Sequence, residues 1–344
     1  MTNNLIALKP SEIEKILKEH NIPLYRRNQI LRWIWEKGSN NIEEFSDLPK
    51  SLRDFLTQNF IILRSKPLSI LHSIDGSIKF LIELENGDRV ESVFIPDADR
   101  ATICVSSQVG CPLKCEFCAT GKLGYTRNLK FHEILEQVRI VRDYVKQRIT
   151  NVVYMGMGEP LLNYEEVMES ARILNNNHAF SIGARKITIS TAGIVPGIIK
   201  LADEPEQFKL AVSLNSAIQE KREKIMPIAK KYNLAELKDA LLYFYQKKHR
   251  WITFEYILIP GVNNSKEDID ALADYASEIP SKINLIPYNP HPYSPYRSPS
   301  DEEVNHFLTK LRKKVKRAVT LRKSRGQDIK GACGQLAYFL KSKE

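Results

Sequence analysis

Hydrophobic positions recur at a helical period in the first 65 residues of the chain. Ser11 and Glu14 have the spacing of an N-terminal capping box. The apolar positions of the same segment are Ile13, Ile16 and Leu17. This pattern predicts a helix that is capped at Ser11 and buries one face.

Two further helices are predicted in this segment. One extends from about Arg27 to Lys37 and ends at Gly38, because glycine often terminates helices. The other begins near Ser51, and its apolar face consists of Leu52, Phe55, Leu56 and Phe60. Residues 1–65 are therefore expected to form a small helical domain.

From about residue 68 the pattern changes to a period of two. Apolar residues alternate with others at Ile78, Phe80, Ile82 and Leu84. Asp75-Gly76 and Asn86-Gly87 have the composition of hairpin turns. Residues 66–96 are therefore expected to form an antiparallel β extension.

Strand and helix patterns then alternate along the chain. The apolar strand segments lie at 101–106, 151–158, 186–193, 208–215, 252–261 and 282–289. Because helices separate them, the six βα units should run in one direction and form a parallel sheet or barrel of the α/β class. Functional residues in such folds collect at the carboxyl ends of the strands.

Three of the five cysteines stand as Cys111-x-x-x-Cys115-x-x-Cys118, soon after the first of these strands. Three thiolates hold three corners of a cubane 4Fe–4S cluster and leave one iron open for a small molecule. The spacing resembles the signature of radical S-adenosylmethionine (SAM) enzymes. A closed zinc site takes four ligands, and Cys104 lies seven residues upstream, so a four-cysteine site is an alternative.

Composition restricts the possible locations and partners of the protein. No apolar run of about 18 residues occurs, which argues against a membrane span. The N-terminus lacks the layout of a signal peptide, and cluster-binding thiols need a reducing compartment, so we expect a cytoplasmic protein. The net charge of +10 favours an anionic partner, most often nucleic acid.

The basic residues are concentrated in two segments. Lys310–Arg325 contains nine lysines or arginines and no acid. Residues 25–33 mix aromatic residues with Arg26, Arg27 and Arg32. Either segment alone could be a solvated helix face, but the two together favour binding to RNA or DNA.

Small and polar residues stand where the predicted strands end. The motif Gly156-Met157-Gly158-Glu159-Pro160 ends the second strand; its glycines allow a ligand to approach the backbone, and Glu159 could bind the ammonium group of SAM. Similar residues end the third, fourth and sixth strands, namely Ser190, Gly193, Ser213, Asn215 and Asn289. Turns and helix caps would explain any one of them, but together they are typical of a ring of ligand contacts.

Two cysteines remain outside the CxxxCxxC motif, Cys104 and Cys333. A lone cysteine is most often a small buried hydrophobic residue. Cys333 stands between Ala332 and Gly334, however, and these small neighbours leave its sulfur accessible. This environment favours a chemical role over a packing role.

Glu91 is the remaining candidate for chemistry. Strand alternation places it on the same face as Val93 and Ile95. A carboxylate beside apolar residues acquires a raised pKa, which suits a general base. An exposed carboxylate on an edge strand is the more ordinary interpretation.

Seven segments along the whole chain resemble, in order, those of one family: RxTxCVSSQVGC, CEFCATG, GMGEP, ITISTAG, SLN, LIPYNP and ACGQL. The family comprises the bacterial dual-specificity RNA adenine-C2 methyltransferases (RlmN) and the related adenine-C8 enzymes (Cfr). The resemblance implies a radical SAM partial (β/α)6 barrel with a small N-terminal helical domain and a β-meander extension. The implied division is an RNA-binding domain at 1–65, the β extension at 66–96, the radical SAM core at 97–328 and a C-terminal segment at 329–344.

The resemblance also implies which residues bind the cofactors. One 4Fe–4S cluster would be held by Cys111, Cys115 and Cys118. SAM, of which two molecules would be used per turnover, would be contacted by Gly158, Glu159, Ser190, Ser213, Leu214, Asn215 and Asn289.

The implied mechanism uses the remaining candidates. One SAM would methylate Cys333, and a second, reduced at the cluster, would give a 5′-deoxyadenosyl radical that takes a hydrogen atom from the S-methyl group. The methylene radical would add to adenine C2, and Glu91 would accept the C2 proton. Cys104 would then form a transient disulfide with Cys333 and release the methylated RNA.

The implied substrates are adenine 2503 of 23S rRNA, at the peptidyl-transferase centre, and adenine 37 of the tRNA anticodon loop. An electron donor such as flavodoxin would act on the protein, which is expected to be a monomer without membrane contact. At Pro160 and Pro287 the chain resembles the C2 enzymes, because the C8 enzymes tend to have other residues at these positions. The residues also leave open a non-catalytic zinc RNA-binding protein and a different radical SAM enzyme, such as a maturase or a methylthiotransferase; the chain lacks the cysteines for the second cluster of a methylthiotransferase.

Overall fold

A ten-stranded sheet organises the chain in the computed structural model, which describes residues 3–337. In spatial order its strands are β14 (Val319–Leu321), β13 (Ser281–Pro287), β12 (Ile252–Leu258), β11 (Lys209–Ser213), β10 (Ile187–Thr191), β9 (Asn151–Tyr154), β6 (Arg100–Cys104), β5 (Arg89–Asp97), β4 (Ile78–Glu83) and β3 (Lys66–His72). Neighbours from β6 to β14 pair in parallel, and those from β3 to β6 pair antiparallel. The predicted α/β class is confirmed.

The six predicted parallel strands all exist, but each is shorter than expected. β9 ends at Tyr154, because the glycine-rich segment 155–158 leaves the sheet to approach another loop. β14 adds a seventh parallel strand that the hydrophobic pattern does not predict. It has three residues and lies within the basic run, so no alternation marks it.

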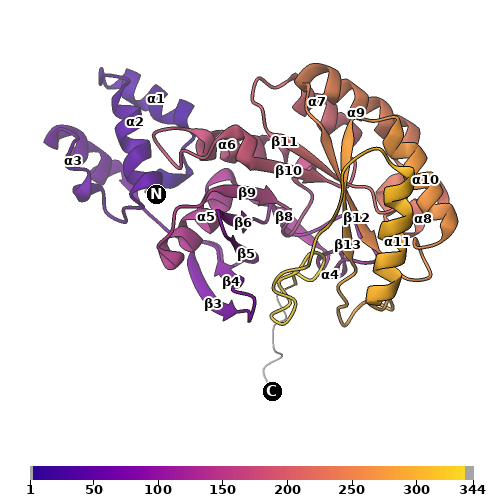
Figure 1. Cartoon of the computed structure of the whole chain (residues 1–344). Helices are drawn as coiled ribbons and strands as arrows, with labels where there is room; N and C mark the ends of the chain where they lie inside the picture. Colours follow the sequence, from indigo (N-terminus) through magenta and orange to yellow (C-terminus); the bar gives the residue numbers. More distant parts are fainter. Residues whose placement is uncertain (1–2, 338–344) are drawn as a thin grey trace.

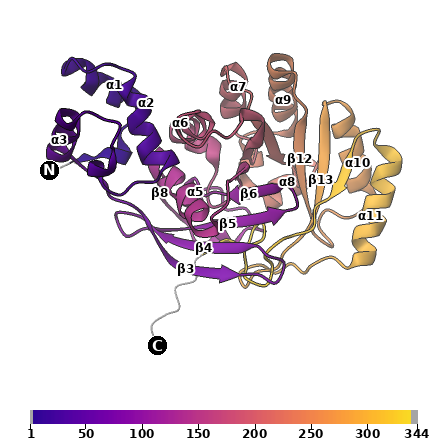
Figure 2. The ribbon, with the colours of Figure 1, turned by 60° about the vertical axis from the view of Figure 1, so that its left-hand side comes forward.

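Helices cover one side of the parallel strands (Figure 1). They are α5 (Phe131–Val145), α6 (Tyr164–Asn175), α7 (Val195–Asp203), α8 (Gln219–Ile225), α9 (Leu234–Lys248), α10 (Lys266–Ser277) and α11 (Asp301–Lys314). The short helix α4 (Ala119–Lys122) instead follows the cysteine loop and contacts the C-terminal segment, where the backbone N–H of Ala119 donates to the carbonyl oxygen of Gly334. The sheet curves, and the C-terminal segment, drawn in yellow, lies beside the tips of β3 and β4 in both ribbon views (Figures 1 and 2). The concave side of the sheet is therefore left for the cysteine loop and this segment.

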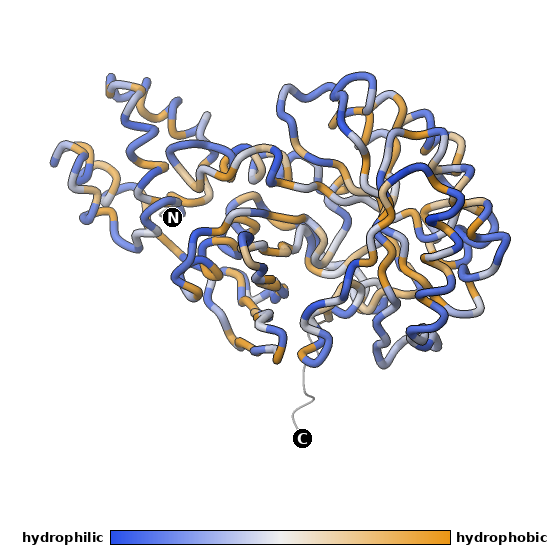
Figure 3. The backbone as a smooth tube through the Cα atoms, viewed as in Figure 1, coloured by the Kyte–Doolittle hydropathy of each residue, from blue (hydrophilic) through white to orange (hydrophobic). Residues whose placement is uncertain are grey.

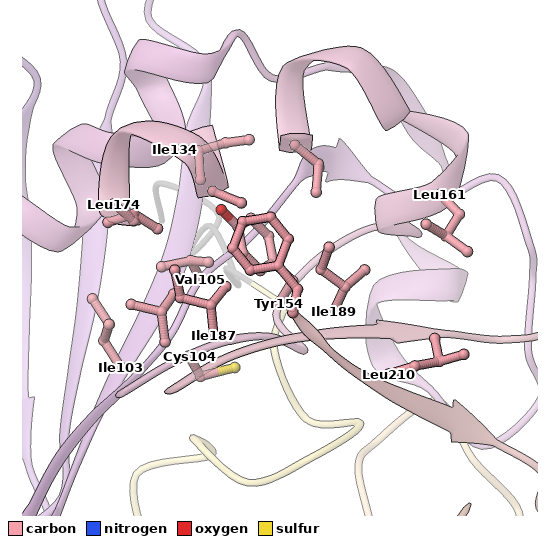
Figure 4. Close-up of a cluster of buried hydrophobic side chains, with 14 of the residues drawn as sticks. Ile103, Cys104, Val105, Ile134, Tyr154, Leu161, Leu174, Ile187, Ile189 and Leu210 are labelled. Carbon is pink, nitrogen blue, oxygen red and sulfur yellow. The ribbon is translucent and has the colours of Figure 1, made fainter. Parts of the chain in front are cut away.

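Alternation along the strands separates the core from the concave side. Ile103 and Val105 point toward Ile134 and Leu174 of the covering helices, whereas Cys104 lies on the side of β6 that faces the C-terminal segment (Figure 4). Hydrophobic stretches follow the strands in the interior, and hydrophilic ones follow the outer loops (Figure 3). Within residues 3–337, no helix is both long enough and apolar enough to cross a bilayer.

The N-terminal segment is helical, as predicted. Its elements are β1 (Asn3–Asn4), η1 (Leu5–Ala7), α1 (Pro10–Glu19), α2 (Arg26–Leu31), the π-helical turn η2 (Arg32–Glu36), η3 (Ile42–Glu44), α3 (Lys50–Asn59) and β2 (Phe60–Ile61). A buried ion pair of 2.7 Å between Arg64 and Glu136 fixes its end against α5. The remaining short elements are β7 (Gln108–Gly110), β8 (Tyr125–Asn128), η4 (Pro160–Leu162), η5 (Ala184–Lys186) and η6 (Pro227–Lys230).

Two local predictions in this segment are wrong. The first helix begins at Pro10, and the carboxylate of Glu12 accepts the backbone N–H of Lys9 at 2.6 Å. Proline fixes φ and needs no hydrogen bond at a first helical position, so the helix begins one residue before Ser11. Phe60 does not belong to the face of α3, because it begins strand β2.

The β extension forms as predicted. β3, β4 and β5 pair antiparallel, and Gly76 and Gly87, each with a φ of 85°, occupy the turns between them. β5 lies between β4 and β6, so it is not an edge strand. The alternative interpretation of Glu91 as an exposed edge carboxylate is therefore wrong: its side chain is buried.

Candidate functional site

The three motif cysteines line one cavity near the carboxyl ends of the parallel strands. They lie in the loop between β7 and α4, where Cys118 is the N-cap of α4. Gly110, with a φ of 77°, stands directly before this loop. The position requires glycine, because a Cβ there would lie 2.0 Å from the carbonyl oxygen of Gly124. The structure thus brings Cys111, Cys115 and Cys118 together, and their role as ligands stays a prediction.

Burial raises the pKa of all three thiols, to about 12 for Cys111. The negative charges of other thiolates and of Glu159 add to this effect at Cys111 and Cys115. Three thiolates can coexist here only beside positive charge, which the irons of a cluster supply.

The chemistry of the donor set fits a cluster, because cysteine thiolates are the usual protein ligands of iron–sulfur clusters. Within residues 3–337, no three His, Cys, Asp or Glu side chains converge as ligands of one metal ion. In a cubane the thiolates bind different irons and do not need to converge. The three thiols therefore fit a 4Fe–4S cluster.

The loop after β9 packs tightly against residues 105–108, which lead from β6 into β7. A Cβ at Gly156 would lie 2.7 Å from the carbonyl oxygen of Val105. A Cβ at Gly158, where φ is 100°, would lie 2.5 Å from the Cβ of Gln108. Both positions require glycine for this approach, and both glycines line the cavity.

Glu159 is a buried carboxylate at the wall of the same cavity. Its two oxygens accept the backbone N–H groups of Leu161 at 3.0 Å and Ala192 at 2.7 Å, which joins the ends of β9 and β10. Burial raises the pKa of Glu159 to about 7. A ligand ammonium group at this wall would favour the ionised carboxylate.

The remaining predicted SAM contacts divide into two groups. Ser190 and Ser213 line the cavity. Leu214 and Asn215 are fully buried behind it. The side-chain oxygen of Asn215 accepts the backbone N–H of Ile257 at 2.9 Å, so in this structure it joins β11 to β12.

Asn289 contacts the C-terminal segment. Its Nδ2 donates to the carbonyl oxygen of Cys333 at 3.3 Å, and its Oδ1 accepts from Gln327 at 2.6 Å. This side chain therefore holds the backbone that carries Cys333.

Cys333 lies between the motif cysteines and Cys104. It lines the cavity of the motif cysteines, and the backbone N–H of Ala119, next to Cys118, donates to the carbonyl oxygen of Gly334 at 2.7 Å. Cys333 also lines a second cavity, whose wall includes Cys104. Both thiols are free, and burial raises the pKa of Cys104 to about 12.

Arg322 is a site residue that the sequence analysis did not single out. It lines both cavities and lies 3.6 Å from Oε2 of Glu255. The pKa of Arg322 is raised, first by the charge of a Cys333 thiolate. In the sequence it is one of nine bases in a run, and only its position directly after β14 separates it from the others.

Glu91 shares a sheet face with Cys104 but lines a different cavity. Val93 pairs with Cys104 across β5 and β6, and Glu91 lies two residues from Val93 on the same face. Nζ of Lys79 lies 3.0 Å from Oε1 of Glu91 and donates to the carbonyl oxygen of Lys330 at 3.3 Å. Burial raises the pKa of Glu91, and Lys79 opposes this effect.

Comparisons with known proteins place the chain in a family. The description "Radical SAM superfamily" matches residues 105–276, and "Ribosomal RNA large subunit methyltransferase N-terminal domain" matches residues 3–62. The dual-specificity RNA methyltransferase RlmN of Geobacter sulfurreducens is 44% identical over 330 residues, which cover 96% of this chain and 91% of that protein. The RlmN of Marinomonas sp. is 41% identical, with 97% and 92% covered. The chain belongs to the RlmN family of radical SAM enzymes.

A solved structure of the same superfamily agrees with this result. The radical SAM methyltransferase from Sphaerobacter thermophilus superposes with a TM-score of 0.90 at 40% identity and covers 97% of this chain and 99% of that one. Membership of the radical SAM superfamily implies SAM and a 4Fe–4S cluster as cofactors. The interpretations as a zinc RNA-binding protein, a maturase or a methylthiotransferase do not agree with an RlmN-type enzyme.

Proposed function

We propose that this RlmN-type RNA methyltransferase methylates C2 of a specific adenine in 23S rRNA and in the tRNA anticodon loop, the positions being adenine 2503 and adenine 37. One observation carries the proposal: Cys333 borders the cavity of the three motif cysteines on one side and the cavity of Cys104 on the other. A cysteine that receives a methyl group in one cavity and is freed from its RNA adduct by a thiol in another needs this arrangement.

Adenine C2 does not attack a methyl cation donor, because it is an electron-poor ring carbon without an available lone pair. A radical SAM centre, when its cluster and SAM are bound, supplies a 5′-deoxyadenosyl radical that removes a hydrogen atom. Cys111, Cys115 and Cys118 would hold the cluster, and each turnover would use two SAM molecules. The carboxylate of Glu159 would orient the SAM ammonium group, with Gly158, Ser190 and Ser213 at the cavity wall.

Cys333 would carry the methyl carbon as a thioether and form the bond to C2 through it. Glu91 would then accept the proton that leaves C2. The unpaired electron left on the adduct would also have to leave, with the oxidised cluster as its acceptor, and the two losses together would restore the aromatic ring. The thiolate of Cys104 would attack the sulfur of Cys333, so that the S–C bond breaks, a disulfide forms and the carbon leaves with the RNA as a methyl group after protonation.

The other predicted SAM contacts keep a supporting position in this proposal. Leu214 and Asn215 would shape the wall from behind, and Asn289 would hold Cys333 near the ligand through its backbone carbonyl. We further propose a cytoplasmic monomer, with boundaries near residues 65, 96 and 328, that receives electrons from a donor such as flavodoxin.

The test is a comparison of three variants under anaerobic conditions. Mass spectrometry should find one added methyl group on Cys333, and Cys333→Ala should abolish turnover. Cys104→Ala should accumulate a covalent protein–RNA adduct, because the carbon cannot be released. Glu91→Gln should also accumulate an adduct, because the C2 proton remains.

The product identifies the methylated atom. Digestion of the RNA should give 2-methyladenosine, whereas 8-methyladenosine as the main product would contradict the assignment to C2. Full activity of Cys333→Ala, together with no adduct in Cys104→Ala, would rule out the covalent route.

A further inference from the structure

Five of the parallel strands carry a cation or a tryptophan at or next to their first residue. These residues are Arg100, Lys186, Lys209, Trp251 and Lys282. Four positions further along the same strands stand Cys104, Ser190, Ser213, Glu255 and Ile286, all of which line the two cavities of the site.

Residues four apart on a strand lie on the same face, because the side-chain period is two. The five residues therefore belong to the concave face that carries the site, but at the opposite mouth of the barrel, about 13 Å away at ~3.3 Å per residue. All five are exposed, and the residues next to them point into the core: Ala101, Ile187, Leu210, Ile252 and Ile283. We name these five residues the cationic mouth.

Of the four cations in the cationic mouth, Arg100 has a carboxylate partner, Asp97, whereas the three lysines have none among the described residues. Within residues 3–337, neither Lys186, Lys209 nor Lys282 forms an ion pair with a carboxylate. Lys186, Lys209 and Lys282 stand at the starts of strands that pair side by side or through one intervening strand. In keeping with this arrangement, the pKa of Lys209 is lowered by partial burial and by the charges of Lys282, Lys186, Arg250 and Arg100.

Apart from Asp97, the acids close to these strands in the sequence have partners outside the cationic mouth. Glu204 and Glu206 both pair with Arg172, at 2.6 and 2.7 Å, and Glu278 pairs with Lys238 at 2.7 Å. Like charges that repel one another without compensation lower stability. Such a group favours an anionic partner that is absent from the free protein.

Trp251 gives the cationic mouth an apolar centre. Its side chain is 51% exposed, and the guanidinium of Arg317 lies 5.3 Å from its ring. Exposed tryptophan beside arginine is typical of the energetic centre of a binding surface. The surface therefore combines long-range attraction with a site for close contact.

We propose that the cationic mouth docks the acidic protein that delivers one electron to the cluster, an inference that rests on the proposed function. RNA that presents its adenine to Cys333 covers the other mouth of the barrel, so a reductant needs a separate approach. Between the two mouths, Asn284 donates to Glu255 at 2.9 Å in a polar layer beneath the cavity. One electron passes from donor to cluster, the donor is oxidised by one electron, and no proton or group is transferred.

The test compares a triple variant with a double variant of the iron-loaded enzyme, without RNA turnover. Lys186→Gln, Lys209→Gln and Lys282→Gln are combined, and the control combines Lys310→Gln with Lys313→Gln, which are exposed on α11. Cluster reduction is followed by absorbance and electron paramagnetic resonance with reduced bacterial flavodoxin, and separately with dithionite. The triple variant should react with flavodoxin about tenfold more slowly at low salt, as expected for lost electrostatic steering. Its rate with dithionite should be unchanged.

Three results would contradict the proposal or reassign the surface. An unchanged flavodoxin rate, or an equal decrease in the control, would exclude this surface as the docking site. A weaker RNA affinity with an unchanged flavodoxin rate would assign the surface to RNA. If the triple variant binds less iron, the single variant Lys282→Glu and the salt dependence of the wild-type rate decide instead. Because reduction is measured without methylation, a failure of the C2 assignment would leave this result intact.

Discussion

Glu159 combines burial with two hydrogen bonds from backbone N–H groups, and its pKa of about 7 lies above the usual value of 4.5. Between these two values the folded protein holds a proton that the unfolded chain has lost. The free energy of unfolding should therefore fall as pH rises from about 4.5 to about 7, by up to ~3 kcal/mol. Outside that range, Glu159 should not contribute to the pH dependence of the unfolding free energy.

Urea denaturation of the metal-free protein at pH 5 and pH 7.5 measures this effect. Glu159→Gln removes the titrating group. The unfolding free energy of this variant should therefore change less between the two pH values than that of the wild type. Equal changes in the two proteins would show that Glu159 is ionised throughout the range.

Arg322 places a positive charge beside both Cys104 and Cys333. Burial raises the pKa of Cys104 to about 12, and the charge of Arg322 opposes this effect. If Cys104 resolves the adduct as we propose, Arg322→Met should slow its attack on Cys333 by about 10- to 100-fold, which corresponds to ~1–3 kcal/mol for a lost charged contact.

The covalent protein–RNA adduct is the measurement that checks this role. It should accumulate in Arg322→Met during single-turnover reactions, and less in Arg322→Lys, which keeps the charge. Normal release of product by Arg322→Met would show that Cys104 is activated in another way.

The sequence analysis identified those site residues that belong to a short local motif. Cys111, Cys115, Cys118 and Glu159 stand in short, recognisable spacings, and the structure places them at one cavity. Arg322 was missed because its importance depends on a three-residue strand that carries it to the cysteines. The burial of Glu91 was misjudged for a similar reason, because an edge strand and an internal strand can share one alternation.

Among the elements, the β3–β4 hairpin holds the segment that carries Cys333. The carboxylate of Asp75 accepts the backbone N–H of Gly326 at 2.7 Å. The carboxylate of Asp328 accepts from Oγ of Ser73 at 2.6 Å and from the backbone N–H of Ile74 at 3.1 Å. The two ribbon views show the same proximity of the hairpin tip and the C-terminal segment (Figures 1 and 2).

Asp328→Ala should release this segment without disturbing the cysteine loop. Tryptic cleavage after Lys323 and Arg325 should become about two- to fivefold faster, because local opening becomes more frequent. Methyl loading of Cys333 should decrease, while iron content stays unchanged. Asp54→Ala on α3 serves as the control, and equal proteolysis of the two variants would argue against this role of the hairpin.

The order of the elements was predictable, but several of their ends were not. The alternation of strands and helices is a property of long apolar segments, and all six predicted strands are present. Ends depend on single contacts. Pro10 displaces the predicted capping box, and the glycines after β9 leave the sheet to approach residues 105–108. β14 was missed because a strand of three residues carries too little pattern.

At the scale of the whole molecule, the basic run Lys310–Arg325 is not one surface. Lys314 forms an ion pair of 2.7 Å with Asp270 on α10, and Arg317 lies over Trp251 near the amino ends of the strands. Lys323 and Arg325 line the cavity of Cys104 and Cys333. The N-terminal basic segment is also partly neutralised, because Arg27 pairs with Glu14 and Arg32 with Glu36.

RNA that reaches Cys333 should therefore contact the end of the run and not its beginning. Combining Lys323→Gln with Arg325→Gln should reduce the slope of log affinity against log salt by about 1.4, at ~0.7 for each lost contact with a phosphate of single-stranded RNA. Lys310→Gln with Lys313→Gln, on α11, should leave the slope unchanged. Equilibrium binding of an anticodon stem-loop between 50 and 200 mM salt measures both. The reverse result would mean that the RNA lies across α11, away from the mouth of the barrel that holds the cysteines.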